Sequence, residues 1–242
     1  MRRLLLLTLF LGALILGAAR WRAQGQTPWA KIATGLEMRR LRTGGVASQG
    51  QVTVVALRTS PTRVRVATGA NLDAAGWRRR TGALVAVNGG FFDEAGHSLG
   101  LRVSNSHRAS RLHGTRWGIF YVRRGRAQIV RTRDFTLRPS VREAVQCGPL
   151  LVANGRPQTL KPQWARRTGI GVQRDGRVVI AVADGALSFQ DWAELWAARG
   201  GLNCPNALNL DGGSSTQLSL KTGERSLEIT GITTVPDAVI IK

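Results

Sequence analysis

Two aspartates beside glycines are the residues of this 242-residue chain best suited to breaking a glycosidic bond. Asp211 lies in the run Asn-Leu-Asp-Gly-Gly-Ser-Ser that begins at Asn209, at the end of an apolar segment, and Asp184 precedes Gly185 at the end of another. Glycoside hydrolysis ordinarily uses two carboxyl groups, one as acid and the other as nucleophile or base. Because single Asp-Gly turns are common, the pair is more informative than either aspartate alone.

Hydrogen-bond donors suited to an anionic substrate occur in similar settings. Asn88 precedes two glycines, which let a ligand approach the main chain closely. Arg167 and Thr168 stand at the start of a β-type run, and a fixed guanidinium is a planar fork of donors for phosphate oxygens. The candidate substrate-binding residues are Asn88, Gly89, Gly90, Thr168, Gly212, Gly213 and Ser214.

No metal or other cofactor is expected. The three histidines lack the spacing of helical metal ligands, and the chain has no CxxC motif. Cys147 and Cys204 each come shortly before a candidate motif, so a disulfide between them would join two loops. A pair of buried, reduced thiols is the equal alternative.

Strands separated by glycine-rich turns must position these groups. Apolar β-type runs and hairpin turns at 123–126 and 174–177 predict an α+β fold in which strands dominate, with one domain and no internal repeat. Loops at the strand ends would form the active-site cleft. The predicted strands are 52–57, 64–67, 83–87, 117–122, 127–130, 178–183 and 238–241.

One helix is predicted after residue 187. Ser188 can cap it and Asp191 follows three residues later, as in a capping box. Trp192, Leu195 and Trp196 then share one face. This spacing is more typical of a buried core than of a sugar-binding platform.

The N-terminus predicts export. Arg2 and Arg3 precede an apolar run that ends in small residues, which indicates a signal peptide, or a retained membrane anchor, over residues 1–19. Residues 20–50 are then a linker and lead-in, and 51–242 the domain. The domain would be periplasmic or secreted, and would meet a membrane only through an uncleaved leader.

The formal charge of +21 favours anionic partners. The arginines are scattered, apart from the run at 78–80, and a genomic preference for arginine explains much of the charge. Few aromatic residues lie between them, and no recognition helix is visible. Nucleic acid is therefore not expected as a partner, and the oligomeric state stays open.

Five ordered segments resemble the phosphodiester glycosidase family, and the stretch 99–104 looks similar too. The set is specific, although no single motif is. The resemblance implies a β-rich α+β fold whose motif loops meet at one cleft, with hydrolysis of a sugar phosphodiester. The segment 202–208, which leads into the last of these motifs, is closer to bacterial members of the family than to its lysosomal member. The identity of the sugar therefore stays open. The segments are 88–92, 147–152, 167–172, 183–185 and 209–215.

These residues suggest a mechanism for anomeric C–O cleavage. Asp211 is the first choice for nucleophile or base and Asp184 the second, while Arg167 and Thr168 would stabilise the departing phosphate. Asn88 would bind the sugar. A metal-dependent phosphodiesterase is disfavoured because the histidines are too few. A non-catalytic cell-envelope module that binds anionic glycopolymers is the alternative from another class.

Overall fold

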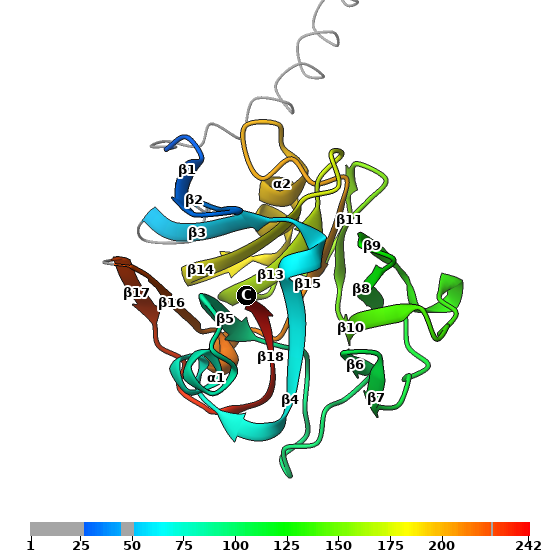
Figure 1. The fold of residues 1–242 in the computed structure, drawn as a ribbon. Coiled ribbons are helices and arrows are strands. Elements are labelled where there is room, and N and C mark those ends of the chain that lie inside the picture. The colour runs from blue at the N-terminus through cyan, green and yellow to red at the C-terminus, as the bar shows by residue number, and fades with distance from the viewer. Residues whose placement is uncertain (1–26, 45–50, 224) are drawn as a thin grey trace, which may run out of the picture.

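The computed structural model describes residues 27–44, 51–223 and 225–242, and strands dominate it (Figure 1). The predicted leader, residues 1–19, lies outside these residues. Within the described ranges no helix is long and apolar enough to cross a membrane. The strands form three antiparallel sheets, which confirms the predicted strand-rich α+β class.

The largest sheet has eight strands in the order β1-β2-β3-β14-β13-β15-β11-β12. The glycosidase-like segments at 167–172, 183–185 and 209–215 lie on or just after its central strands, so this sheet positions most of the candidate chemistry. The strands are β1 (Ala30–Ala33), β2 (Leu36–Gly44), β3 (Gln51–Thr59), β11 (Leu150–Ala153), β12 (Arg156–Pro157), β13 (Trp164–Val172), β14 (Val178–Ser188) and β15 (Asn206–Asn209).

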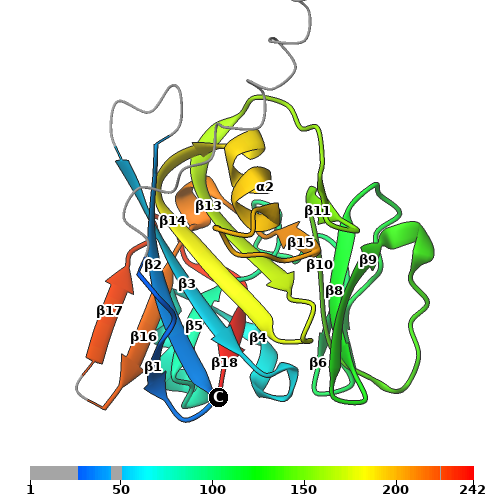
Figure 2. The same cartoon turned by 90° about the horizontal axis from the view of Figure 1, so that it is seen from above.

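Two five-stranded sheets complete the framework. The second sheet has the order β7-β6-β10-β8-β9 and the third the order β17-β16-β5-β18-β4. Figure 2 shows β16 and β17 beside β1 and β2, on the opposite side of the molecule from the second sheet. The strands are β4 (Val64–Leu72), β5 (Val85–Asn88), β6 (Arg102–Ser104), β7 (His107–Ser110), β8 (Gly118–Arg123), β9 (Arg126–Arg131), β10 (Val141–Cys147), β16 (Leu218–Thr222), β17 (Arg225–Ile229) and β18 (Val235–Ile241).

The predicted helix is α2 (Phe189–Ala197), and its cap is as expected. Ser188 Oγ accepts a hydrogen bond from the Asp191 amide at 3.0 Å. Trp192 and Trp196 are fully buried against β13. A Cβ at Gly169 would come within 2.8 Å of Trp196, so the glycines of β13 make room for the indole rings. The tryptophans are therefore core residues, as their spacing indicated.

A second helix, α1 (Ala74–Thr81), was not predicted. Asp73 caps its first turn, and Gly82 ends it in the left-handed conformation with φ of 61°. Only Ala74 and Trp77 of this helix are buried, and the Trp77 indole donates to the Val235 carbonyl at 3.0 Å. The helix thereby covers the third sheet.

Apolar side chains from all three sheets meet in one central cluster, which includes Val87, Phe120 and Ile170. A second cluster lies on the other face of the eight-stranded sheet, under α2. Because side chains alternate between the two faces of a strand, neighbours such as Val179 and Ile180 belong to different clusters.

The sheet begins earlier in the chain than the predicted domain boundary. Strands β1 and β2 belong to the segment 20–50, which the sequence indicated as linker and lead-in. Each residue of β2 from Leu36 to Gly44 pairs with β3, so this segment is an integral part of the eight-stranded sheet.

The two cysteines are buried and free, which is the second of the two alternatives. Cys147 packs in the central cluster and Cys204 in the cluster under α2, on opposite faces of the same sheet. Their sulfur atoms therefore face different cores. Burial raises the pKa of the Cys147 thiol to about 12, and that of Cys204 is raised as well.

Candidate active site

Asp211 lies in the loop of residues 210–215 that follows β15, hereafter the Asp211 loop. Its amide donates to the Gly89 carbonyl at 3.0 Å, and the Asn88 Nδ2 donates to the Asp211 carbonyl at 2.8 Å. The Gly212 amide donates to Asp211 Oδ1 at 2.9 Å. The predicted motifs at 88–90 and 211–213 thus bind each other directly, although they are far apart in sequence.

Asn88 is fully buried and holds these motifs together. Its Oδ1 accepts from Thr168 Oγ1 at 2.7 Å and from the Gln217 amide at 3.2 Å. With its amide group on the Asp211 carbonyl, this side chain has protein partners at both ends. The structure therefore places Asn88 and Thr168 beneath the Asp211 loop as supports, rather than in an open position where a sugar could reach them.

A buried ion pair, which the sequence reasoning missed, lies behind these motifs. Arg102 Nε is 2.9 Å from Asp237 Oδ1, and both side chains are fully buried. Arg102 also donates to the carbonyls of Gln146 at 2.9 Å and Phe91 at 3.1 Å. Asp237 accepts from the Gly90 amide at 3.0 Å. The ion pair therefore joins β6 of the second sheet to β18 of the third.

Two sequence signals could have pointed to this pair. Arg102 belongs to the stretch 99–104 that looked similar to the family, and Asp237 is a charge inside an apolar strand. The ion pair also explains why residues 89 and 90 are glycines, because it leaves no room for a side chain at either position. A Cβ at Gly89 would be 1.7 Å from Asp237 Oδ1, and one at Gly90 would be 2.3 Å from Arg102 Nη2.

The environment of Asp211 suits a proton-transfer or nucleophilic role. Burial raises the pKa of its carboxyl above the ordinary value of 3.8, despite hydrogen bonds from the Ser215 side chain and the Gly212 amide that lower it. The charge of Asp237 also raises it, and Arg102 opposes that effect. Perturbed carboxyl groups of this kind are typical of functional sites.

The glycines after Asp211 expose main-chain donors. Gly213 has φ of +62°, and a Cβ there would meet no other atom within 4 Å. The amides of Gly213 and Ser214 have no acceptor among the residues that the structure describes. Ser214 is exposed. These amides are thus available beside the Asp211 carboxyl.

Asp184 lies on β14, near the surface, and its side chain is 53% exposed. Arg166 Nη2 donates to Asp184 Oδ1 at 3.0 Å, and Arg166 Nη1 donates to the Thr230 carbonyl at 2.9 Å. The Arg166 carbonyl is 2.9 Å from the position that a Cβ would take at Gly212. Arg166, which was not predicted as a site residue, therefore binds Asp184 through its side chain and passes close to Gly212 with its main chain.

Arg167 points to the opposite face of β13 and is almost fully buried. It donates to the carbonyls of Leu187 at 3.1 Å and Gln163, and its guanidinium stacks 3.5 Å from the centre of the Phe189 ring. Burial lowers its pKa to about 10. Its Nη1 has no hydrogen-bond partner in the described part of the chain and lies 4.0 Å from the Cβ position at Gly212. Two of its three nitrogens are therefore engaged by the protein.

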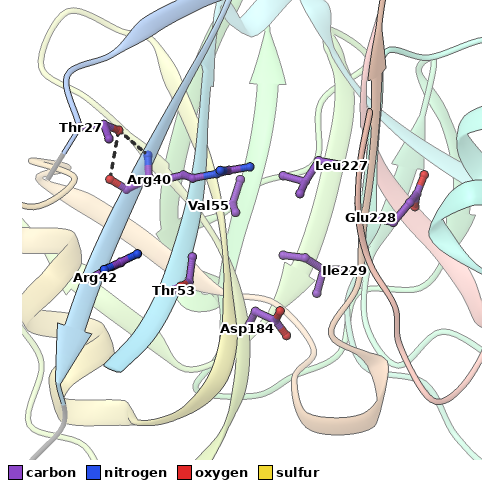
Figure 3. Close-up of a pocket in the computed structure, with 9 residues that line it drawn as sticks. All are labelled: Thr27, Arg40, Arg42, Thr53, Val55, Asp184, Leu227, Glu228 and Ile229. Atoms are coloured by element: carbon purple, nitrogen blue, oxygen red, sulfur yellow. Dashed lines mark hydrogen bonds between the residues drawn. The ribbon is translucent and has the colours of Figure 1, made fainter. Parts of the chain in front are cut away.

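A groove of about 440 Å³ opens at Asp184, between the eight-stranded sheet and β17 (Figure 3). Arg40, Arg42, Thr53 and Val55 line one side, while Leu227, Glu228 and Ile229 line the other. Thr27, the first residue that the structure describes, also lines the groove. In Figure 3, Asp184 lies next to Ile229, at one end of the groove.

A model of the phosphodiester glycosidase family matches residues 81–242, more than half of the chain. The chain belongs to this family. The match includes all five of the predicted segments, the Arg102–Asp237 ion pair and the Asp211 loop. The matched residues also include the central strands of the eight-stranded sheet, β13, β14 and β15.

One curated protein is similar to this chain in sequence. The chain is 33% identical over 142 residues to the uncharacterized protein YigE of Escherichia coli (strain K12), covering 53% of this chain and 55% of that one. It thus spans about half the length of this curated relative.

Two solved structures share the phosphodiester glycosidase fold seen here. The catalytic domain of zebrafish N-acetylglucosamine-1-phosphodiester alpha-N-acetylglucosaminidase, auto-inhibited by its pro-peptide, has a TM-score of 0.71 and 16% identity, over 91% of this chain and 88% of that one. A hypothetical protein from Synechocystis has a TM-score of 0.60 and 17% identity, over 89% and 64%. At these identities the likeness concerns the fold.

Replacing Gly89 by alanine is expected to destabilise the protein strongly. The new methyl group would occupy the place of Asp237 Oδ1 and separate it from Arg102. Disrupting a buried ion pair by removing one partner costs about 3–5 kcal/mol, and a loss of this size is expected in chemical unfolding. Gly114→Ala, in open space on an exposed loop, is the control and should change little. Equal stabilities of the two variants would contradict the proposed role of Gly89.

Replacing Asp211 by asparagine should change stability in a pH-dependent way. Because the pKa of Asp211 is raised on folding, its ionisation destabilises the native state as pH rises above the ordinary value of 3.8. The melting temperature of Asp211→Asn relative to wild type is therefore expected to increase between pH 3.5 and pH 7.

Asp93→Asn provides a control with the opposite sign. The pKa of Asp93 is lowered, mainly by the His97 amide, so its ionised form is favoured in the native state. This variant should lose stability relative to wild type as pH rises through the same window. The same trend in both variants would show that Asp211 is not a buried, disfavoured carboxylate.

Proposed function

We propose that the chain is a hydrolase that cleaves the anomeric C–O bond of a sugar-1-phosphodiester, releasing the sugar and a phosphate monoester. The observation that carries this proposal is the Asp211 carboxyl, partly buried and raised in pKa where the two glycine motifs meet. Membership of the phosphodiester glycosidase family supports the substrate class.

In the proposed reaction the anomeric carbon gains an oxygen from water and loses the phosphate oxygen. The bonding electrons leave with the phosphate monoester, which is a much better leaving group than a sugar alkoxide. Asp211 either takes the proton of the attacking water or first attacks the carbon itself. Asp184 is the second carboxylate, and Arg166 holds it in place.

The phosphate needs donors that do not move during the reaction. The amides of Gly213 and Ser214 lie next to Asp211, and neither has an acceptor within the described ranges. Nη1 of Arg167 lies close to Gly212 and can add a charged donor. One fixed donor of this type contributes about 3 kcal/mol to stabilisation of the developing charge. Asn88 and Thr168 would position these groups from below rather than bind substrate.

The sugar and the location are also proposals. The zebrafish relative acts, by its name, on an N-acetylglucosamine-1-phosphodiester, which makes this sugar the first one to test. The predicted leader at 1–19 supports export, with the domain periplasmic or secreted.

Asp211→Asn is expected to reduce sugar release by at least about 100-fold, because the carboxylate acts directly on the reacting atoms. The assay uses purified protein and a panel of sugar-1-phosphodiesters that includes N-acetylglucosamine-1-phospho-methyl. Asp184→Asn should cause a smaller loss. Asp134→Asn is the matched control, because this exposed aspartate lies in the short 3-10 helix Thr132–Asp134 after β9, outside the site.

Each variant is first compared with wild type by circular dichroism and thermal melting, so that a folding defect is recognised. Wild-type rates in a folded Asp211→Asn protein would overturn the assignment of Asp211. If Asp184→Asn lost all sugar release and Asp211→Asn kept the wild-type rate, Asp184 would be the nucleophile or base and Asp211 the second carboxylate.

A further inference from the structure

The groove that opens at Asp184 continues away from the proposed site. A neighbouring hollow of about 520 Å³ shares Thr27, Arg40 and Leu227 with it and extends to Arg225. Together they form one channel between β1–β3 and the β16–β17 hairpin, hereafter the arginine groove. Figures 1 and 2 agree in placing these strands side by side. The arginine groove is therefore long enough for more than a single sugar phosphate.

The strand register gives the arginine groove an order. Arg42 pairs with Thr53, and Thr53 pairs with Asp184, so these residues form one row across β2, β3 and β14. At a strand spacing of roughly 4.8 Å, the Arg42 and Asp184 backbones are about 10 Å apart. Arg40 lies in the parallel row with Val55, further from Asp184. Figure 3 shows the same order.

The position of Arg40 is fixed by its main chain. The Arg40 amide donates to Thr27 Oγ1 at 2.9 Å, and the Thr27 amide donates to the Arg40 carbonyl at 3.1 Å. Arg40 and Arg42 are two residues apart on β2, so their side chains point to the same face, about 7 Å apart along the strand. Arg39, the residue before Arg40, points to the other face and donates to the carbonyls of Gly200 and Gly201.

The positive charges of this channel are not neutralised. Arg40, Arg42 and Arg225 form no ion pair with any residue that the structure describes. Of the two acidic residues of the lining, Asp184 is paired with Arg166. The Glu228 carboxyl points away from the groove in Figure 3 and accepts from Ser219 Oγ at 2.7 Å. A row of unpaired guanidinium groups beside a narrow channel attracts successive anionic groups.

The lining also indicates which polyanion fits. None of the lining residues is aromatic, so there is no platform on which nucleic-acid bases could stack. The apolar lining residues are all non-aromatic and suit the carbon chain of a polyol or a sugar. They are Pro28, Ala30, Met38, Val55, Leu220, Leu227 and Ile229.

We propose that the arginine groove binds the leaving-group side of a linear polymer of phosphodiester-linked polyols or sugars. The terminal sugar would lie at Asp211, and the following phosphates would run past Arg42 and then Arg40. This inference rests on the proposed function for the position of the sugar, but binding of the polymer does not require turnover. The substrate is thus a phosphate-bearing polymer rather than a small diester.

The test measures binding of fluorescently labelled poly(glycerol phosphate), about ten units long, to the Arg40→Gln/Arg42→Gln double variant. Both arginines are exposed, so the fold should be unaffected. Affinity is expected to fall about 10-fold or more. The slope of log K against log salt should become less steep by about 1.4, the value for two lost phosphate contacts on a flexible chain.

Arg108→Gln/Arg111→Gln is the matched control, since both arginines are exposed and lie by β7, away from this channel. It should bind like wild type. Equal affinity of the Arg40/Arg42 variant and wild type would overturn the proposal. An oligothymidine of the same charge that binds as tightly as the polymer, and loses affinity in the same variant, would also overturn it.

Activity separates this proposal from the proposed function. On a sugar-terminated polymer the Arg40/Arg42 variant should show a raised KM, with a much smaller change on the methyl diester. Absence of sugar release from every substrate, with polymer binding that depends on Arg40 and Arg42, would refute the hydrolase and support the groove. Release with equal KM changes on both substrates would refute the groove and support the hydrolase.

Discussion

The buried ion pair between Arg102 and Asp237 is the interaction on which the candidate site depends. Charges removed from water must be paired and hydrogen-bonded, and these two also hold the Gly90 amide and the Phe91 carbonyl. The pair joins two sheets and fixes the loop after β5 between them. That loop in turn holds the Asp211 main chain through Gly89 and Asn88. The position of the candidate carboxyl of Asp211 therefore depends on a pair of charges that is fully buried.

The large positive charge is divided among arginines with different surroundings. Arg102 neutralises a buried aspartate, while Arg167 is held by carbonyls and by the Phe189 ring. On β2 successive side chains point to opposite faces of the sheet. Arg39 therefore binds carbonyls near α2, while Arg40 and Arg42 face the groove. Of these arginines, Arg40 and Arg42 are exposed, and they have no ion-pair partner within the described ranges. A net charge of +21 is therefore less informative than the face on which each arginine lies.

The sequence predicted the strand-rich fold, seven of its strands (β3, β4, β5, β8, β9, β14 and β18) and the capped helix α2, because apolar runs and capping residues are local signals. It missed α1, which buries only Ala74 and Trp77 and so shows no apolar stripe. It also missed the Arg102–Asp237 pair, whose members are 135 positions apart and meet only through sheet packing. The motif residues were found as a group, but their division into Asp211 at the site and Asn88 beneath it required the hydrogen bonds. Arg166 and Arg167 are adjacent residues of the same type, so the sequence did not show that their side chains point to opposite faces of β13.

Hydrolysis of a sugar-1-phosphodiester in ¹⁸O-water tests the central claim most directly. The account predicts that one ¹⁸O atom appears in the released sugar and none in the phosphate monoester, since the bond that breaks is between the anomeric carbon and oxygen. Mass spectrometry of both products, within minutes of mixing, reads the result before the free sugar exchanges its anomeric oxygen with the solvent. Label in the phosphate would mean that the P–O bond is cut, and would contradict the proposed role of Asp211 at a glycosidic carbon.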